Sequence, residues 1–360
     1  MSEILISYDE KKETFDSYAL ALKSLLNTLI RGEGLSVHSL DSRVKNRKSL
    51  EAKIEKKDKY NVLNDITDVI GIRIITHYAD DVDKIAKLVE SEFSVDFENS
   101  IDKRISIEPD KFGYLSLHYI VTLNEARSVL KEYETYKDIK AEIQIRSILQ
   151  HAWAEIEHDI GYKSAIGLPN NIRRAFSRLS GLLELADEEF IKIKEKISAR
   201  QQEVAKELEQ GSGESHLDIV ALDEFLNKST ILDDIAIQIK ERHDLIVNGR
   251  NKDKDLEYLL HGLYFINITT IAELNEALLN FKEQVINRAS WFSNGFRSFY
   301  KNRPLARDTI LSYLCQIIVA LRNSTEFETE YCEIAHVRLT GNNIPRFFET
   351  LRKNLKDVES

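Results

Sequence analysis

Polar side chains alternate with apolar ones in a short segment near the middle of the chain. In KAEIQIR, which spans 140–146, Glu142, Gln144 and Arg146 alternate with alanine and isoleucine. Because successive side chains of a β-strand point to opposite faces, these three groups share one face if the segment is a strand. Such a face can simply contact water, as one side of an antiparallel sheet commonly does, or it can carry a site built around the carboxylate.

Two other segments carry polar groups with a similar pattern. Ser116 and His118 alternate with apolar residues, and Arg73 stands inside an apolar run that follows Asp68. If the polar faces of these strands coincide, Asp68 and Glu142 meet basic and neutral donors over one sheet. Two carboxylates near phosphates are how a protein holds Mg²⁺, which prefers hard oxygen ligands. The pattern therefore predicts a magnesium site formed by these two acidic side chains.

A strongly basic segment precedes these strands. We interpret residues 41–57 as a helix, on which Lys45, Ser49 and Lys53 are spaced i, i+4, i+8 and Arg43 lies alongside. A charged run of this kind is commonly a solvated helix face. The functional alternative is a phosphate-binding stripe, because a triphosphate needs several cations at close range and arginine can grip phosphate oxygens with two hydrogen bonds.

A glycine-containing turn connects the expected strands 103–108 and 116–123. Gly113 permits backbone conformations that are barred to other residues, and Tyr114 beside it can present its ring to a base. An ordinary hairpin loop is the alternative, since glycine is the default residue of turns. Lys111 adds a positive charge to the same loop.

Composition places the chain among ordinary globular proteins. It has 360 residues, of which 42% are hydrophobic and 31% charged, and a formal net charge of −10. This charge argues against a protein that coats nucleic acid without specificity, so an anionic ligand needs a local basic pocket. Charges occupy the N-terminus where a signal peptide would be apolar, and no segment has the apolar length of a membrane helix, which favours a cytoplasmic protein without membrane contact. Cys315 and Cys332 are expected to be buried free thiols.

The expected fold class is α+β, with a mixed β-sheet flanked by helices and then a mostly helical C-terminal domain. The Gly/Ser-rich segment 211–215 is the clearest linker, so we place one domain at 1–210 and the other at 216–360. Periodicity predicts strands at 69–77, 103–108, 116–123 and 139–146, and helices at 12–31, at 80–93 with an Asp80 or Asp81 cap, from 147 onward and at about 171–209.

Four ordered blocks of this chain resemble the synthetase domain of the RelA/SpoT family, the enzymes that make guanosine tetra- and pentaphosphate. The blocks are SRVKNRKSLEAK, DVIGIRI, KFGYLSLH and EIQIRSILQHAWAEIEHDIGYK, within roughly residues 40–165. The resemblance implies a nucleotidyltransferase-like fold and transfer of the β,γ-diphosphate of ATP, with Mg²⁺, to the ribose 3′-hydroxyl of a guanine nucleotide such as GDP or GTP. The long members' hydrolase domain has no counterpart here, so we expect no alarmone hydrolysis.

The resemblance also implies a role for each matching residue. Asp68 is implied as a magnesium ligand, and Glu142 as the residue that assists the metal and activates the attacking 3′-hydroxyl. The residues implied for ATP binding are Arg43, Lys45, Ser49, Lys53 and Arg73. Those implied for acceptor binding are Lys111, Gly113, Tyr114, Ser116, His118, Gln144 and Arg146, with the Tyr114 ring stacked on the acceptor base.

Two questions stay open at the level of sequence. Leu115 follows Tyr114 where many family members carry arginine or glutamine, so the acceptor is either a free guanine nucleotide or, as in toxic relatives, the 3′ end of tRNA. In the second case residues 216–360 would act as an inhibitor or sensor. The apolar stripe of the helix at 171–209 can pack within the chain or across a homo-oligomer.

Overall fold

A computed structural model describes residues 2–56, 60–102, 116–163, 169–210, 213–249, 256–295 and 304–356. The chain forms two compact units, Met1–Lys194 and Glu195–Ser360. The division falls inside the long helix α6 (Asn170–Gln210) and not at the Gly/Ser-rich segment. The last turns of α6 belong to the second unit because Val204 is buried in its core and Arg200 Nε donates to Asp218 at 3.0 Å.

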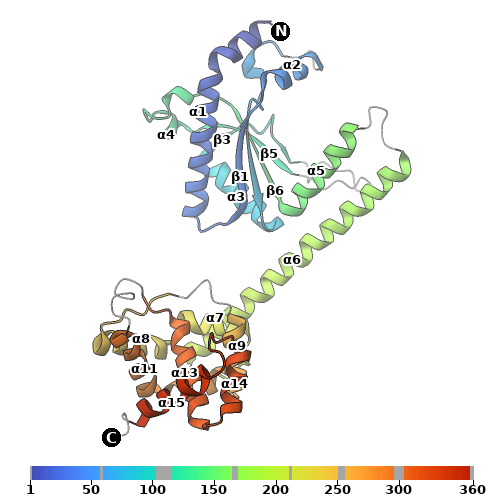
Figure 1. Cartoon of the computed structure of the whole chain (residues 1–360). Coiled ribbons are helices and arrows are strands. Elements are labelled where there is room, and N and C mark those ends of the chain that lie inside the picture. The colour runs from blue at the N-terminus through green and yellow to red at the C-terminus, as the bar shows by residue number, and fades with distance from the viewer. Residues whose placement is uncertain are drawn as a thin grey trace. The chain divides into compact units, whose positions relative to one another are not determined.

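The first unit is a mixed six-stranded sheet with helices packed beside it (Figure 1). Its strand order is β1-β2-β6-β5-β3, with β4 also paired to β5; β2 and β6 are parallel and the other pairs antiparallel. The elements are α1 (Ser2–Gly32), β1 (Val37–Val44), α2 (Arg47–Lys56), η1 (Leu63–Asp65), β2 (Ile70–Thr76), α3 (Ala79–Glu92), β3 (Phe93–Val95), β4 (Ile101–Asp102), β5 (Leu117–Leu123), α4 (Glu125–Ser128), η2 (Glu134–Tyr136), β6 (Ala141–Ser147), α5 (Ile148–Lys163) and the first part of α6. The expected mixed sheet is confirmed.

Alternation along the central strands decides which sheet face is covered. On β2, Ile70, Ile72 and Ile74 are buried with Tyr18 and Leu22 of α1 in one core. Burying an aliphatic side chain of this size contributes about 1.5–3 kcal/mol, so this row holds α1 against the sheet. The other face of β2 carries the half-buried Arg73, and it is this face that is free for polar chemistry.

The prediction of one helix over 41–57 is wrong. Residues 37–44 form the edge strand β1, which pairs with β2, and the helix α2 covers Arg47–Lys56 in the described part of this span. The helix begins after Asn46, whose Oδ1 accepts a hydrogen bond from the Ser49 backbone N–H at 2.8 Å. Pairing with a long apolar strand overrode the helical preference of the basic residues, as tertiary context commonly does. Arg43 therefore lies on a strand and Lys45 in the connection to α2.

Other local predictions fare differently. The helix 80–93 is confirmed as α3, but Asp80 and Asp81 do not cap it: α3 starts after Tyr78, which makes no side-chain cap. The two carboxylates instead bind the lysine Lys194 at 3.0 Å each, which ties α6 to α3 within the first unit. The expected strand 103–108 lies outside the described residues.

The second unit is helical, as predicted. Its helices are α7 (Ile219–Lys228), α8 (Thr230–His243), α9 (Leu256–Phe265), α10 (Ile271–Asn280), α11 (Lys282–Gly295), α13 (Arg307–Arg322), α14 (Thr325–Ile334) and α15 (Asn343–Lys356). Cys315 and Cys332 are buried free thiols, as expected. In the described part of the chain, no helix combines the length and apolar character that crossing a membrane requires. Apolar side chains of α6, among them Phe190 and Ile193, are exposed. Their packing, within the chain or across a homo-oligomer, stays a prediction.

A buried carboxyl joins α6 to the end of β6. Ser147 Oγ donates to Asp187 Oδ2 at 2.8 Å, and burial raises the pKa of Asp187 to about 6. Because the folded state favours protonated Asp187, this group contributes most to the free energy of unfolding at pH values below the unfolded pKa of 3.8. That contribution is lost as the pH rises through the folded pKa of about 6. Asp187→Asn, which removes the charge and keeps the shape, is therefore expected to raise the melting temperature at pH 8 by a few degrees, at about 2–4 °C per kcal/mol for a unit of this size. Thermal unfolding at pH 5 and pH 8 checks this, and a gain of equal size at both pH values would contradict the charge explanation.

Candidate active site

The register of the sheet brings the polar side chains of four strands onto one face. Gly71 of β2 pairs with Arg43 on one side and Glu142 on the other. In the next row, Arg73 pairs with Gln144, and Gln144 pairs with His118 of β5. Residues directly opposite each other project to the same face. The hypothesis that these polar faces coincide is confirmed.

Glu142 is held by a chain of hydrogen bonds along this face. Ser116 Oγ lies 2.7 Å from His118 Nε2, and His118 Nδ1 lies 3.0 Å from Glu142 Oε1. A carboxylate only accepts, so His118 Nδ1 donates to Glu142, and the contact between His118 Nε2 and Ser116 Oγ extends the chain to the serine. On the other side, Gln144 Nε2 donates to Glu142 Oε2 at 2.8 Å, and Arg146 Nη2 donates to Gln144 Oε1 at 2.7 Å.

This network decides the protonation state of Glu142. Burial and the nearby charge of Asp68 act to raise the pKa of Glu142, but the contacts with His118 and Gln144 outweigh them and hold this pKa below its ordinary value. Glu142 is therefore a carboxylate at neutral pH, with both oxygens oriented by donors. A group fixed in this way is suited to accept a proton from a positioned hydroxyl.

Asp68 lies between two lysines. Lys45 Nζ is 2.9 Å from Asp68 Oδ2, and Lys53 Nζ is 2.7 Å from Oδ1. Burial by itself raises the pKa of Asp68, but the two ammonium groups together lower it below its usual value. We predicted both lysines on one helical stripe. Lys45 lies instead in the β1–α2 connection and Lys53 on α2, and the two side chains meet at the Asp68 carboxylate. The Tyr8 hydroxyl donates to the Lys45 backbone carbonyl at 2.6 Å and so fixes this connection.

A hollow of about 140 Å³ lies over the β1–β2 pair. Arg43, Gly71, Arg73 and Gln144 are among the residues that line it. Gly71 lets the Arg43 side chain lie close to the strand: a Cβ there would be in contact with Arg43 Nε, at 3.4 Å. We did not single out Gly71 from the sequence, although a glycine within a strand often marks a close approach of a ligand or another chain segment.

Other predicted site residues contact partners outside the predicted set or lie outside the described residues. Ser49 is exposed on α2, and its backbone N–H donates to Asn46 Oδ1. Arg73 Nη1 pairs with Glu155 Oε1 of α5 at 3.2 Å, a partner that we did not predict. The predicted acceptor residues Lys111, Gly113 and Tyr114 lie outside the described residues.

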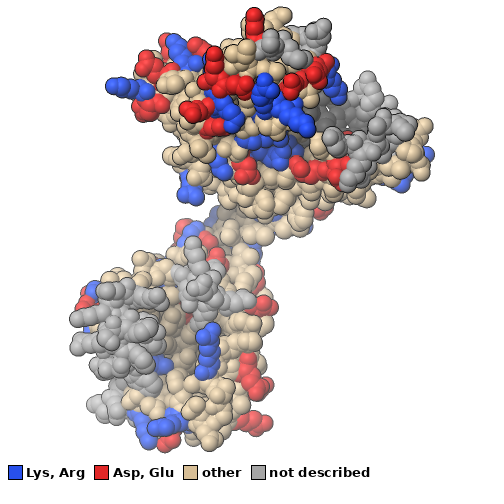
Figure 2. Space-filling model, turned by 45° about the horizontal axis from the view of Figure 1, so that its top comes forward, with Lys and Arg blue, Asp and Glu red and all other residues tan. Residues whose placement is uncertain are grey.

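The charges of this face suit a phosphate-bearing ligand and a hard metal ion. Figure 2 shows lysine and arginine side chains gathered over one area of the first unit, with acidic side chains beside them. Within the described part of the chain, no group of three or more His, Cys, Asp or Glu side chains is arranged to hold a metal by itself. Asp68 and Glu142 are both ionised, and Mg²⁺ typically takes one or two carboxylates and completes its shell with water and substrate phosphates. The donor set therefore fits Mg²⁺ that binds together with a nucleotide.

Comparison with known families matches this part of the chain. Residues 42–166 match the family described as the region found in RelA/SpoT proteins. The name RelA/SpoT region denotes these matched residues. Among curated proteins, the RelA/SpoT region is similar to the GTP pyrophosphokinase YjbM of Bacillus subtilis (strain 168), with 30% identity over 137 residues, and to the GTP pyrophosphokinase YwaC of the same organism, with 28% identity over 173 residues. The matches span 37% and 47% of this chain, and 60% and 79% of those proteins.

Solved structures similar to this chain include the small alarmone synthetase 1 from Bacillus subtilis. The match has 23% identity and a TM-score of 0.45, and covers 54% of this chain and 98% of that one. A GTP pyrophosphokinase family protein from Streptococcus pneumoniae is similar to this chain with the same identity and TM-score. That match spans 54% of this chain and 96% of the Streptococcus protein. The predicted site residues that the structure describes lie in the RelA/SpoT region, whereas the second unit lies outside it.

Proposed function

We propose that this protein is a pyrophosphokinase, which transfers the β,γ-diphosphate of ATP to the ribose 3′-hydroxyl of a guanine nucleotide, GDP or GTP. The observation that carries the proposal is the ionised Glu142, held by His118 and Gln144 beside the Asp68–lysine cluster, inside a RelA/SpoT region. The relatives named above are GTP pyrophosphokinases, which supports the same reaction class. We place the activity in the cytoplasm, where both nucleotides are available.

The donor side uses the cations of the sheet face. Lys45 and Lys53 pair with Asp68, while Arg43 and Arg73 line the hollow over β1 and β2. We assign ATP to these four residues, with Ser49 at the exposed edge. Mg²⁺, held by Asp68 and Glu142 when bound, supplies charge neutralisation on the phosphates. Positioning and electrostatics account for most of the catalysis of phosphoryl transfer, and this set of fixed charges provides both.

The acceptor side begins at Glu142. The 3′-oxygen forms a bond to the β-phosphorus, the bond from that phosphorus to the α,β-bridging oxygen breaks, AMP leaves, and the hydroxyl proton passes to the Glu142 carboxylate. Ser116, His118, Gln144 and Arg146 would hold the acceptor as well as orient this base. Lys111, Gly113 and Tyr114 keep the acceptor roles that the family resemblance implies.

The test is transfer of label from ATP labelled at the γ-phosphate. The purified protein is incubated separately with GDP, GTP, ATP and bulk tRNA, and the labelled product is identified. Label on guanine nucleotides alone is the expected result. Label on tRNA alone would replace the free nucleotide by the tRNA 3′ end as the acceptor, and no label on any acceptor would overturn the proposal.

His118 is expected to set the lower pH limit of the reaction. His118→Ala removes a hydrogen bond that lowers the pKa of Glu142, so this pKa rises and more of the base is protonated at a given pH. Turnover at saturating acceptor should then fall off at a higher pH than in the parent protein. His118→Asn, which keeps a donor toward Glu142, should return the pH at which turnover falls off to that of the parent protein. If His118→Ala raised the KM for the acceptor but left the acidic side of the pH profile of turnover unchanged, His118 would bind the acceptor without tuning the pKa of Glu142.

A further inference from the structure

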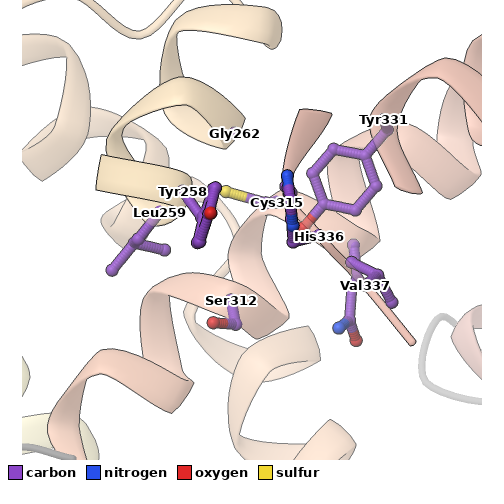
Figure 3. A pocket seen from close by; sticks show the side chains of 10 residues that line it. Tyr258, Leu259, Gly262, Ser312, Cys315, Tyr331, His336 and Val337 are labelled. Atoms are coloured by element: carbon purple, nitrogen blue, oxygen red, sulfur yellow. The ribbon is translucent and has the colours of Figure 1, made fainter. Parts of the chain in front are cut away.

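The second unit contains a pocket of about 160 Å³ that the proposed reaction does not use. It lies between α9, α13 and the end of α14 (Figure 3). Leu259, Cys315 and Tyr331 are buried and form its floor, and Tyr258, Gln316 and His336 form its rim. A buried apolar floor beneath a rim with a few polar groups is the usual construction of a small-molecule site.

The wall of the pocket depends on a residue in an unfavourable backbone conformation. His336 follows the last turn of α14 with φ of +47°, in the left-handed region that favours glycine. The chain around it makes a helix-ending motif, in which the Val337 backbone N–H donates to the Cys332 carbonyl at 2.9 Å. A side chain other than glycine or asparagine in such a position costs on the order of 1 kcal/mol. Histidine is one of the residue types enriched in this region, so the modest strain is tolerated at His336, and what the residue adds to the pocket comes from its ring.

The His336 ring is stacked on Tyr258. Their centroids are 3.8 Å apart and the ring planes meet at 23°, and Figure 3 shows the two rings side by side at the pocket, with the Tyr331 ring beyond them. The close approach of α9 to α14 that makes this possible occurs at Gly262, where a Cβ would stand 3.4 Å from both Ala335 Cβ and Tyr331 Cε2. The strained position thus presents a second aromatic ring to the pocket.

The lining specifies the chemistry of a ligand. Asp, Glu, Lys and Arg are absent from the described residues that line the pocket, so nothing there would compensate a charged ligand. Three aromatic rings and a thiol favour a flat aromatic body. Gln316 Oε1 accepts from Arg288 Nη2 at 3.2 Å, so its side-chain N–H groups are the part that can donate to an acceptor on the ligand. An apolar cavity of about 150 Å³ in an engineered lysozyme holds one benzene molecule, which sets the scale of the ligand.

We propose that this pocket binds a small, neutral, planar aromatic heterocycle of one or two fused rings that carries a hydrogen-bond acceptor at its edge. The proposal is independent of the reaction in the first unit, because it rests only on residues of the second. Benzimidazole at pH 8 serves as the probe, since it is planar, uncharged and has a ring-nitrogen acceptor. The experiment is a titration of the full-length protein, followed by ligand-observed NMR and by the shift in melting temperature. A saturable dissociation constant on the order of 1 mM or below is expected for so few atoms.

His336→Gly is the decisive variant. Glycine adopts the same backbone conformation without strain, so the second unit should remain folded while the wall of the pocket is lost. Benzimidazole binding is expected to weaken at least fivefold. Asn323→Gly is the matched control, since Asn323 ends α13 with φ of +51° and does not line the pocket; its affinity should equal that of the parent. Ser312→Leu, which fills the pocket from α13, should weaken binding as His336→Gly does.

Three results would count against the proposal. One is the lack of saturable benzimidazole binding up to about 10 mM, tenfold above the affinity expected for a ligand of this size. Another is equal affinity in the parent, His336→Gly and Ser312→Leu, which would place the probe elsewhere. Cyclohexanol, of similar bulk without a flat aromatic face, should bind at least fivefold more weakly than benzimidazole, and equal binding would contradict the aromatic character assigned to the pocket.

Discussion

Glu142→Gln should reduce the turnover number of diphosphate transfer by about 10²–10⁴-fold, the range that a positioned general base contributes. The glutamine keeps the shape of the side chain but cannot take the proton of the attacking hydroxyl. ATP affinity should fall much less than turnover, because the four cations assigned to the triphosphate, Lys45, Lys53, Arg43 and Arg73, are untouched and Asp68 still holds Mg²⁺. A loss mainly in turnover is the signature of an interaction that acts in the transition state. The measurement is single-turnover transfer from labelled ATP together with ATP binding at equilibrium.

The control for this variant is Glu134→Gln, the same change at an exposed position of η2 outside the site. It should leave turnover and binding unchanged. If Glu142→Gln kept more than about a tenth of the parent turnover, well outside the range for a lost general base, the assignment of Glu142 as base would be wrong. The transfer reaction itself could still stand, because the labelled-product experiment tests it separately.

Asp68→Asn is the second change with a large expected effect. It removes the charge that lies 2.9 Å from Lys45 Nζ and 2.7 Å from Lys53 Nζ. The two ammonium groups then face each other without a counter-charge, and the proposed metal loses a ligand. Turnover should fall by about 10²-fold, comparable to the loss of one preorganised electrostatic group in other enzymes. The concentration of Mg²⁺ needed for half-maximal activity should rise, which separates metal binding from a general loss of folding.

A charge-neutralising change elsewhere gives the comparison for Asp68→Asn. Asp138 has φ of +64°, a conformation that asparagine adopts as readily, and it is exposed. Asp138→Asn should therefore leave the Mg²⁺ dependence unchanged. An Asp68→Asn protein with lower activity but the parent Mg²⁺ dependence would show that Asp68 serves only to place the two lysines.

The elements predicted best were those whose period is long and uninterrupted. The strands 116–123 and 139–146 appear as β5 and β6, and the helix at 171–209 appears as α6 with bounds within a few residues. The failures have a common cause. The segment 37–44 forms a strand because β2 offers it a free edge, and the last turns of α6 join the second unit because Val204 fits its core. Neither the edge nor the core is a property of the local sequence.

The sequence by itself determined the chemistry available to this protein: two carboxylates and a set of cations, in blocks whose order resembles one family. Tertiary structure alone decided how these groups are paired. Parallel pairing of β2 with β6 sets Arg73 beside Gln144, and the antiparallel β5 sets His118 where it orients Glu142. Asp68 meets Lys45 and Lys53 because the turn before β2, the β1–α2 connection and α2 converge there, although the sequence suggested a single helical stripe. The physical reason is that pKa values and ion pairs depend on distances of a few ångströms between residues far apart in the chain, and local periodicity does not encode those distances.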